Sequence, residues 1–142
     1  MVLIVVDTNV FVGACLGKGP SNAVVEACLT GRFVALMGAA LLAEYEDVLG
    51  RRALFESCRL SAAEREELLD IFLATCRWTR IYYGWRPNLR DEGDNHLVEL
   101  AVAGGANVIA THNIRHLRAM ELRFPGLAIA TPAQLLAMEQ TP

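Results

Sequence analysis

The chain opens with Leu3-Ile4-Val5-Val6-Asp7-Thr8-Asn9, an apolar run that stops at an acidic residue. The run is short, continuous and rich in β-branched side chains, which is typical of a strand covered on both faces in a parallel sheet. An aspartate at the end of such a strand is costly to ionise unless it is paired, hydrogen-bonded or bound to a metal ion. This stretch therefore predicts a buried strand and a first candidate functional residue, Asp7.

Strands and helices are expected to alternate along the rest of the chain. Further strands are expected at residues 33–37, 79–83, 107–110 and 127–130. Helices are expected from a Ser21 cap to Gly31, over 39–49, from the Ser61/Glu64 capping box to about Arg77, over 94–103, and from Pro132 onward. The alternation predicts one α/β domain over residues 1–142, with helices on both faces of a mostly parallel sheet of about five strands. In such sheets, ligands bind at the carboxyl ends of the strands.

The composition fits a single globular domain. The 142 residues are 54% hydrophobic and carry a net charge of −3, which excludes a disordered chain. The longest nearly apolar stretch, 33–43, is shorter than the roughly 18 residues that a membrane span needs. The N-terminal run has no basic region before it, so we expect no signal peptide and a cytoplasmic protein. The four cysteines lack metal-binding spacing and are expected to be free thiols.

Charge is unevenly distributed along the chain. Residues 77–90 contain four arginines and no acidic residue, whereas residues 91–99 contain four acidic residues and no basic one. Aromatic side chains are interleaved with the arginines of the first segment, at Trp78, Tyr82, Tyr83 and Trp85. Arginines and aromatic rings together suit single-stranded RNA, with Arg86 and Arg90 as candidate contacts. The same residue types also predominate in protein interfaces, so composition leaves both alternatives open.

Several polar side chains are placed where a ligand would bind. Asn113 follows the fourth expected strand, as Asp7 follows the first. Asp94 begins a predicted helix, with Asp91 three residues earlier, and Glu44 lies at the edge of the apolar stripe of another helix. Each position has a simpler explanation, because Asp and Asn often cap helices and a glutamate at the edge of a stripe can face water.

Taken together, these residues predict a metal site. Carboxylates gathered at one edge of a sheet repel one another unless a counter-ion is present. Mg²⁺ or Mn²⁺ prefers oxygen ligands and keeps several waters, and such an ion can activate water and neutralise the charge that develops on a phosphodiester. This is the chemistry of a metal-dependent nuclease.

Five segments in order along the chain resemble the PIN domain family, in particular its VapC-like branch of toxins from toxin–antitoxin modules. The resemblance covers nearly the whole chain and rests on residues 6–9, 41–49, 90–101, 105–111 and 130–136. It implies a three-layer αβα PIN-like fold and a metal-dependent ribonuclease, often a homodimer inhibited by a cognate antitoxin.

The resemblance also implies roles for individual residues. Asp7, Glu44 and Asp94 match the family's first three acids, and Asn113 matches a fourth position that is Asp in many relatives and Asn in many others. Asp7 and Asp94 are expected to bind Mg²⁺ or Mn²⁺ directly, and Glu44 to bind it through water or to orient the attacking water. Thr8 and Asn9 match the polar pair that braces the first acid. Asp91 is expected to act as an outer-shell residue.

Three further residues are of interest near the expected site, and two segments differ from the family pattern. Arg115 and Arg118 share a helical face after Asn113, so they are candidates to clamp a phosphate, although a solvated face explains them equally well. His96, two residues after Asp94, is expected at the surface. The chain departs from the family pattern at Glu92-Gly93, where relatives often have Pro and Asp, and at Gly38, where a Ser is common.

Two alternatives to a nuclease remain open. In a phosphohydrolase, Asp7 would be the nucleophile, but such sites usually have a second Asp two residues on, where this chain has Asn9. In a non-catalytic PIN scaffold, RNA or protein binding would survive the loss of Asp7 and Asp94.

Overall fold

The computed structural model describes residues 2–80, 95–117, 124 and 126–140. Within these residues, the strands are β1 (Val2–Val6), β2 (Phe33–Met37), β3 (Arg77–Trp78), β4 (Val108–Ala110) and β5 (Ala128–Ala130). The helices are α1 (Thr8–Cys15), α2 (Gly19–Leu29), α3 (Ala39–Leu49), the 3₁₀ turn η1 (Arg52–Phe55), α4 (Ala62–Thr75), α5 (Asn95–Gly104), α6 (Ile114–Leu117) and α8 (Pro132–Gln140).

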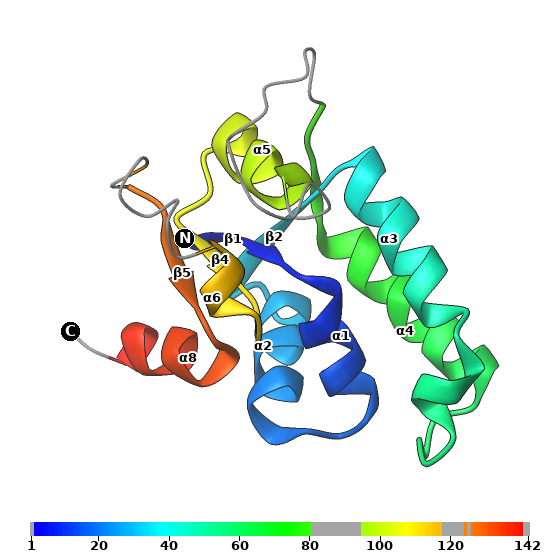
Figure 1. Cartoon of the computed structure of the whole chain (residues 1–142). Coiled ribbons are helices and arrows are strands. Elements are labelled where there is room, and N and C mark those ends of the chain that lie inside the picture. Colours follow the sequence, from blue (N-terminus) through cyan, green and yellow to red (C-terminus); the bar gives the residue numbers. More distant parts are fainter. Residues whose placement is uncertain (1, 81–94, 118–123, 125, 141–142) are drawn as a thin grey trace.

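The sheet is parallel throughout, with β1 at its centre. The strand order is β3-β2-β1-β4-β5. The helix α5 lies on one side of the sheet and α2 and α8 on the other, while α3 and α4 run alongside each other near the β2–β3 edge (Figure 1). The predicted three-layer α/β architecture with a five-stranded parallel sheet is therefore confirmed.

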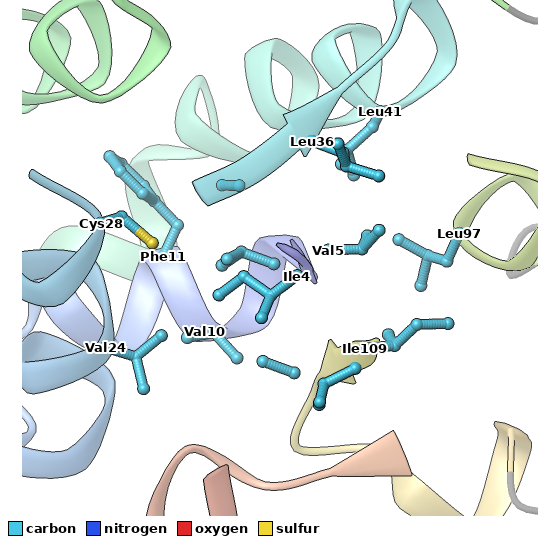
Figure 2. Packing of buried hydrophobic residues seen from close by; sticks show 14 of the residues in the cluster. Ile4, Val5, Val10, Phe11, Val24, Cys28, Leu36, Leu41, Leu97 and Ile109 are labelled. Atoms are coloured by element: carbon cyan, nitrogen blue, oxygen red, sulfur yellow. The ribbon is translucent and has the colours of Figure 1, made fainter. Parts of the chain in front are cut away.

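The core is packed against both faces of β1. Successive residues of a strand point to opposite faces, and both Ile4 and Val5 are fully buried. Ile4 points toward the side of Phe11 and Val24, whereas Val5 points toward Leu97 of α5 (Figure 2). The first strand is thus covered on both faces, as its apolar run predicted.

The thiols are part of this packing. Cys15 and Cys28 are buried, Cys58 and Cys76 are partly buried, and all four are free. Burial raises the pKa of Cys15 to about 11 and that of Cys28 to about 12. These two cysteines are therefore neutral at physiological pH and act as small apolar side chains.

Several elements differ from the sequence-based predictions, and β4 and β5 each begin one residue later than expected. Ser21 does not cap α2, because the helix already begins at Gly19 with Pro20 in its first turn, which leaves Ser21 inside it. The helix α1 was not predicted, since its Val10, Phe11 and Val12 are residue types that favour strands. The helix α4 ends at Thr75, and β3 pairs at Arg77 and Trp78 instead of starting at Thr79. The capping box of Ser61 and Glu64 is present as predicted, and so is the start of α8 at Pro132.

No helix within the described residues is long and apolar enough to cross a membrane.

Candidate active site

The candidate site lies at the switch point of the sheet, beside β1, where the chain stops adding strands on one side and continues on the other. The chain leaves β1 toward β2 on one side, and β4 lies on the other side of β1. The residues that follow β1 and β4 therefore meet at the carboxyl edge, where ligands bind in sheets of this type. A hydrogen bond from the backbone nitrogen of Asp7 to the carbonyl oxygen of Ala110 (3.0 Å) joins the two strand ends.

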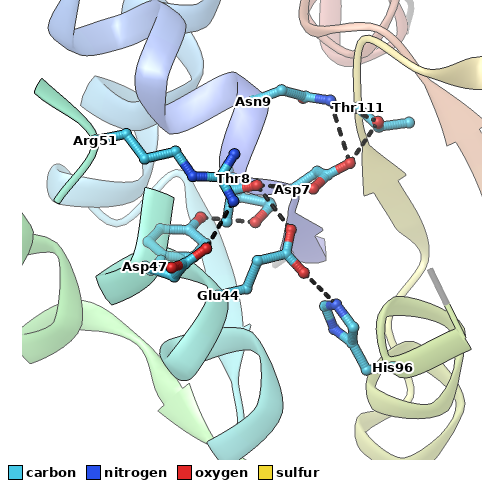
Figure 3. A network of polar contacts seen from close by, with 10 residues as sticks. Asp7, Thr8, Asn9, Glu44, Asp47, Arg51, His96 and Thr111 are labelled. Carbon is cyan, nitrogen blue, oxygen red and sulfur yellow. Dashed lines mark hydrogen bonds and ion pairs between the residues drawn. The ribbon is translucent and has the colours of Figure 1, made fainter. Parts of the chain in front are cut away.

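Asp7 is buried at this point, with 5% of its surface exposed. It occupies the N-cap position of α1, yet its side chain makes no capping hydrogen bond. Instead, Oδ2 accepts hydrogen bonds from Thr111 Oγ1 (2.8 Å) and Asn9 Nδ2 (3.3 Å), while Oδ1 lies 3.4 Å from Thr8 Oγ1 (Figure 3). The simpler explanation of Asp7 as a helix cap is therefore wrong, because its carboxylate is turned into a polar cluster.

The environment of Asp7 opposes its negative charge. Burial is the largest effect and raises the pKa of the carboxyl above its usual value, and the charge of Glu44 raises it further. Hydrogen bonds from Thr111 and Thr8 act in the opposite direction but do not cancel the rise. A cation beside Asp7 would favour the ionised form, so the site has the electrostatic character of a cation-binding position.

Glu44 reaches the same cluster from α3. The next residue, Tyr45, is fully buried and donates a hydrogen bond from its hydroxyl to the carbonyl oxygen of Val6 (2.6 Å). This bond ties α3 to the end of β1, and it leaves the Glu44 side chain facing α1. Oε1 of Glu44 accepts a hydrogen bond from Thr8 Oγ1 at 2.9 Å. Thr8 thus lies between the two carboxylates, and the structure brings Asp7 and Glu44 together as predicted.

His96 lies in the cluster, although the sequence placed it at the surface. Its Nε2 is 2.5 Å from Oε2 of Glu44, and its side chain is only 17% exposed (Figure 3). A weak signal was present in the sequence, because His96 precedes Leu97 and lies four residues before Leu100. Both leucines belong to the buried stripe of α5, so His96 lies at its edge, as Glu44 does in α3.

The loop after β4 closes the other side of the cluster. The backbone nitrogen of His112 donates to Asn9 Oδ1 (3.2 Å), and that of Asn113 donates to Thr111 Oγ1 (3.0 Å). Asn113 is exposed and shares Thr111 with Asp7, so the predicted proximity of these two positions is seen. Thr8 and Asn9 both contact the Asp7 carboxylate, whereas Thr111 is a contact that the sequence reading missed.

Several predicted site residues lie outside the described residues: Asp91, Asp94, Arg86, Arg90 and Arg118. Arg115 is described and is exposed on α6. Within the described part of the chain, no group of three or more His, Cys, Asp or Glu side chains could hold a metal ion. The described cluster therefore contributes two carboxylates, which suits a Mg²⁺ ion that keeps several waters and is bound by one or two carboxylates.

Comparison with known protein families identifies the family to which the chain belongs. A sequence profile described as PIN domain matches residues 3–115, which include the ends of β1 and β4 and the helices α1, α3 and α5 that form the cluster. The chain belongs to the PIN domain family. The family assignment based on the sequence motifs is thus confirmed.

A solved structure is similar to this PIN domain over most of its length. It is the crystal structure of VapBC2 from Rickettsia felis bound to a DNA fragment from their promoter. The match has a TM-score of 0.54 and 16% sequence identity, and covers 89% of this chain and 96% of the other. At this identity the likeness concerns the fold. A search of curated proteins gives no match.

Proposed function

We propose that this PIN domain is an endoribonuclease that depends on Mg²⁺ or Mn²⁺ and hydrolyses phosphodiester bonds of RNA. The observation that carries the proposal is the buried Asp7 carboxylate at the end of β1, joined through Thr8 to Glu44. A buried carboxyl group whose ionisation is opposed by burial and by a neighbouring carboxylate is suited to a divalent cation. A bound cation of this kind supplies a Lewis acid for the phosphate and lowers the pKa of a water molecule.

Each residue of the cluster has a role in this proposal. Asp7 would bind the cation directly together with Asp94, and Glu44 would accept a proton from the attacking water or hold that water in line with the phosphorus. Asn9 and Thr111 orient the Asp7 carboxylate through their hydrogen bonds, and Thr8 lies between this carboxylate and that of Glu44. The amide of Asn113 would hold a water or a phosphate oxygen, and Asp91 would support the site from outside.

The proposal for substrate and partner is supported by the arginines of the sequence and by the structural relative. Arg86, Arg90, Arg115 and Arg118 would contact the phosphates of the RNA. The structure similar to this chain is titled as a VapBC2 complex bound to promoter DNA. By analogy, we propose that this chain is the toxin of a type II toxin–antitoxin pair, acts in the cytoplasm as a homodimer or larger homo-oligomer, and is inhibited by a cognate antitoxin.

Cleavage of a mixed single-stranded RNA pool tests the nuclease. With Mg²⁺ or Mn²⁺, the wild-type protein should cleave the pool, and EDTA should stop the reaction. Asp7→Asn and Glu44→Gln keep the shape of the side chains but remove a charge, and each should lower the rate by at least about 100-fold, because replacing an outer-shell residue alone costs about 10–100-fold.

The matched control is Asp47→Asn on the same helix as Glu44. Asp47 is exposed and pairs with Arg51, so its loss should leave cleavage unchanged. Cleavage that persists in Asp7→Asn would contradict the assignment of the site. RNA binding without cleavage at any metal concentration would instead favour the non-catalytic scaffold, and a phosphoenzyme trapped on Asp7 would favour the phosphohydrolase.

A further inference from the structure

The contact between His96 and Glu44 joins two helices that are distant in sequence. His96 belongs to the first turn of α5 and Glu44 to the middle of α3, and their side chains meet at 2.5 Å. His96 is the more buried partner, with 17% of its side chain exposed against 35% for Glu44. A short contact between partly buried groups is a stronger restraint than an exposed ion pair.

The direction of this hydrogen bond follows from the chemistry of the two groups. The contact is a hydrogen bond from Nε2 of His96 to Oε2 of Glu44 when the ring carries a hydrogen on Nε2, because an ionised carboxylate can only accept. The other ring nitrogen, Nδ1, is buried and has no hydrogen-bond partner among the residues that the structure describes. Within that part of the chain, the polar contact of the imidazole is directed to Glu44 alone.

The Glu44 carboxylate is therefore held at both of its oxygens. Oε1 accepts from Thr8 Oγ1 on α1, and Oε2 accepts from His96 Nε2 on α5. Two donors from different elements fix the plane of the carboxylate, which a single hydrogen bond would leave free to rotate. The chain of contacts runs from His96 through Glu44 and Thr8 to Asp7 (Figure 3).

We infer that His96 is a positioning residue of the site, which holds the Glu44 carboxylate in the orientation needed to bind or direct the metal-associated water. The inference rests on the proposed function, because it assigns a task to Glu44 in that reaction. His96 acts through Glu44 and does not itself contact the metal or the RNA, since its Nε2 is already committed to the carboxylate.

Two substitutions of His96 differ in which ring nitrogen they imitate. His96→Gln can place an amide nitrogen near the position of Nε2 and so keep the hydrogen bond to Glu44. His96→Asn places its amide near the position of Nδ1 and cannot reach. For both variants we would measure the Mn²⁺ affinity, from the paramagnetic resonance signal of the free ion. We would also measure kcat and KM for RNA cleavage. A thermal unfolding curve of each variant shows that it is folded.

We expect His96→Asn to weaken Mn²⁺ binding and to lower kcat by about 10–100-fold, with KM for RNA unchanged, as for other residues that orient a metal ligand. His96→Gln should recover most of both quantities. A purely structural role would not separate two amides that differ by one methylene. The inference is overturned if His96→Asn keeps the wild-type affinity and kcat, or if His96→Gln is as impaired as His96→Asn.

A double substitution tests whether His96 acts through Glu44. In a Glu44→Ala background, adding His96→Asn should weaken Mn²⁺ binding by less than about 2-fold, because the residue that His96 positions is gone. A further loss of 10-fold or more would show that His96 acts independently and would overturn the inference. Failure of the proposed function is seen separately, as a wild-type protein that binds no Mn²⁺ or cleaves no RNA.

Discussion

At the scale of single residues, Asp7 is the group of the site whose ionisation is opposed by its surroundings. The carboxylate is 5% exposed, and its hydrogen bonds from Thr111 and Asn9 do not offset the loss of water and the nearby charge of Glu44. Buried groups with perturbed pKa values cluster at functional sites, where they lower the stability of the fold. The pattern implies that removing the charge should help the fold while it harms the reaction.

The first prediction follows from the raised pKa of Asp7. The folded protein holds the Asp7 proton to a higher pH than the unfolded chain does, so stability falls as the pH rises from the ordinary pKa of an aspartate through the raised one. Asp7→Asn has no proton to lose. In EDTA at pH 7 we expect this variant to unfold roughly 2–4 °C above the wild type, the shift produced by about 1 kcal/mol in a domain of this size.

The pH dependence and a control variant show whether the gain in stability comes from the ionisation of Asp7 or from the loss of any carboxylate. The difference between Asp7→Asn and wild type should shrink as the pH is lowered through the raised pKa and vanish below 3.8, the ordinary pKa of an aspartate, where Asp7 is protonated in both states. Asp47→Asn removes an exposed carboxylate paired with Arg51 and should not raise the unfolding temperature. A wild type that is more stable than Asp7→Asn at pH 7 without metal would contradict the argument.

At the scale of elements, the close approach of α5 to the sheet depends on a missing side chain. A Cβ atom added at Gly104 would overlap with Cδ1 of Leu36, and it would lie 3.1 Å from Thr79 Oγ1. Leu36 is fully buried in β2, so it has little room to move. The helix that carries His96 can therefore lie against β2 only if residue 104 has no side chain.

Gly104→Ala should destabilise the fold by about 1–3 kcal/mol, the usual cost of forcing extra volume into a packed core. The measurement is denaturant unfolding followed by circular dichroism. Gly19→Ala is the control, because a Cβ at Gly19 in α2 would meet nothing within 4 Å. The control should be neutral or slightly stabilising, since alanine favours a helix over glycine. Equal effects of the two substitutions would contradict the packing argument.

The same scale shows which elements the sequence could predict. The helix α3 has the predicted bounds, because its apolar stripe is regular and Gly50 follows it. The helix α1 was missed, since its Val10, Phe11 and Val12 are β-branched and aromatic residues that favour strands. The strand β3 is two exposed residues at the edge of the sheet, so no apolar pattern marks it, and its position is set by pairing with β2.

Some residues of the candidate site could also be predicted from the sequence, and others could not. Asp7 and Glu44 could be predicted because each interrupts or borders an apolar pattern, and Thr8 and Asn9 because they adjoin Asp7. His96 and Thr111 were missed because their partners lie 52 and 104 residues away in the chain. Such contacts depend on how α3, α5 and β4 pack, and local sequence patterns do not contain that information.

At the scale of the whole molecule, binding of a cation to the folded protein changes the free energy of unfolding. A cation that binds only the folded site raises stability in proportion to the logarithm of its concentration, by about 2.7 kcal/mol at 100 times its Kd. In a domain of 142 residues this corresponds to a rise in the unfolding temperature of roughly 5–10 °C. Because Asp7 and Glu44 come from different elements, the unfolded chain offers no comparable site.

We therefore expect Mn²⁺ or Mg²⁺ to raise the unfolding temperature of the wild type and of Asp47→Asn, and to have little effect on Asp7→Asn. Combined with the first prediction, the order of stability should reverse: Asp7→Asn is the more stable protein in EDTA, and the wild type is the more stable one at saturating metal. Scanning calorimetry of the three proteins in both conditions measures this directly. An equal rise in the wild type and in Asp7→Asn would place the bound cation elsewhere, and no rise in any of them would remove the metal from the proposed mechanism.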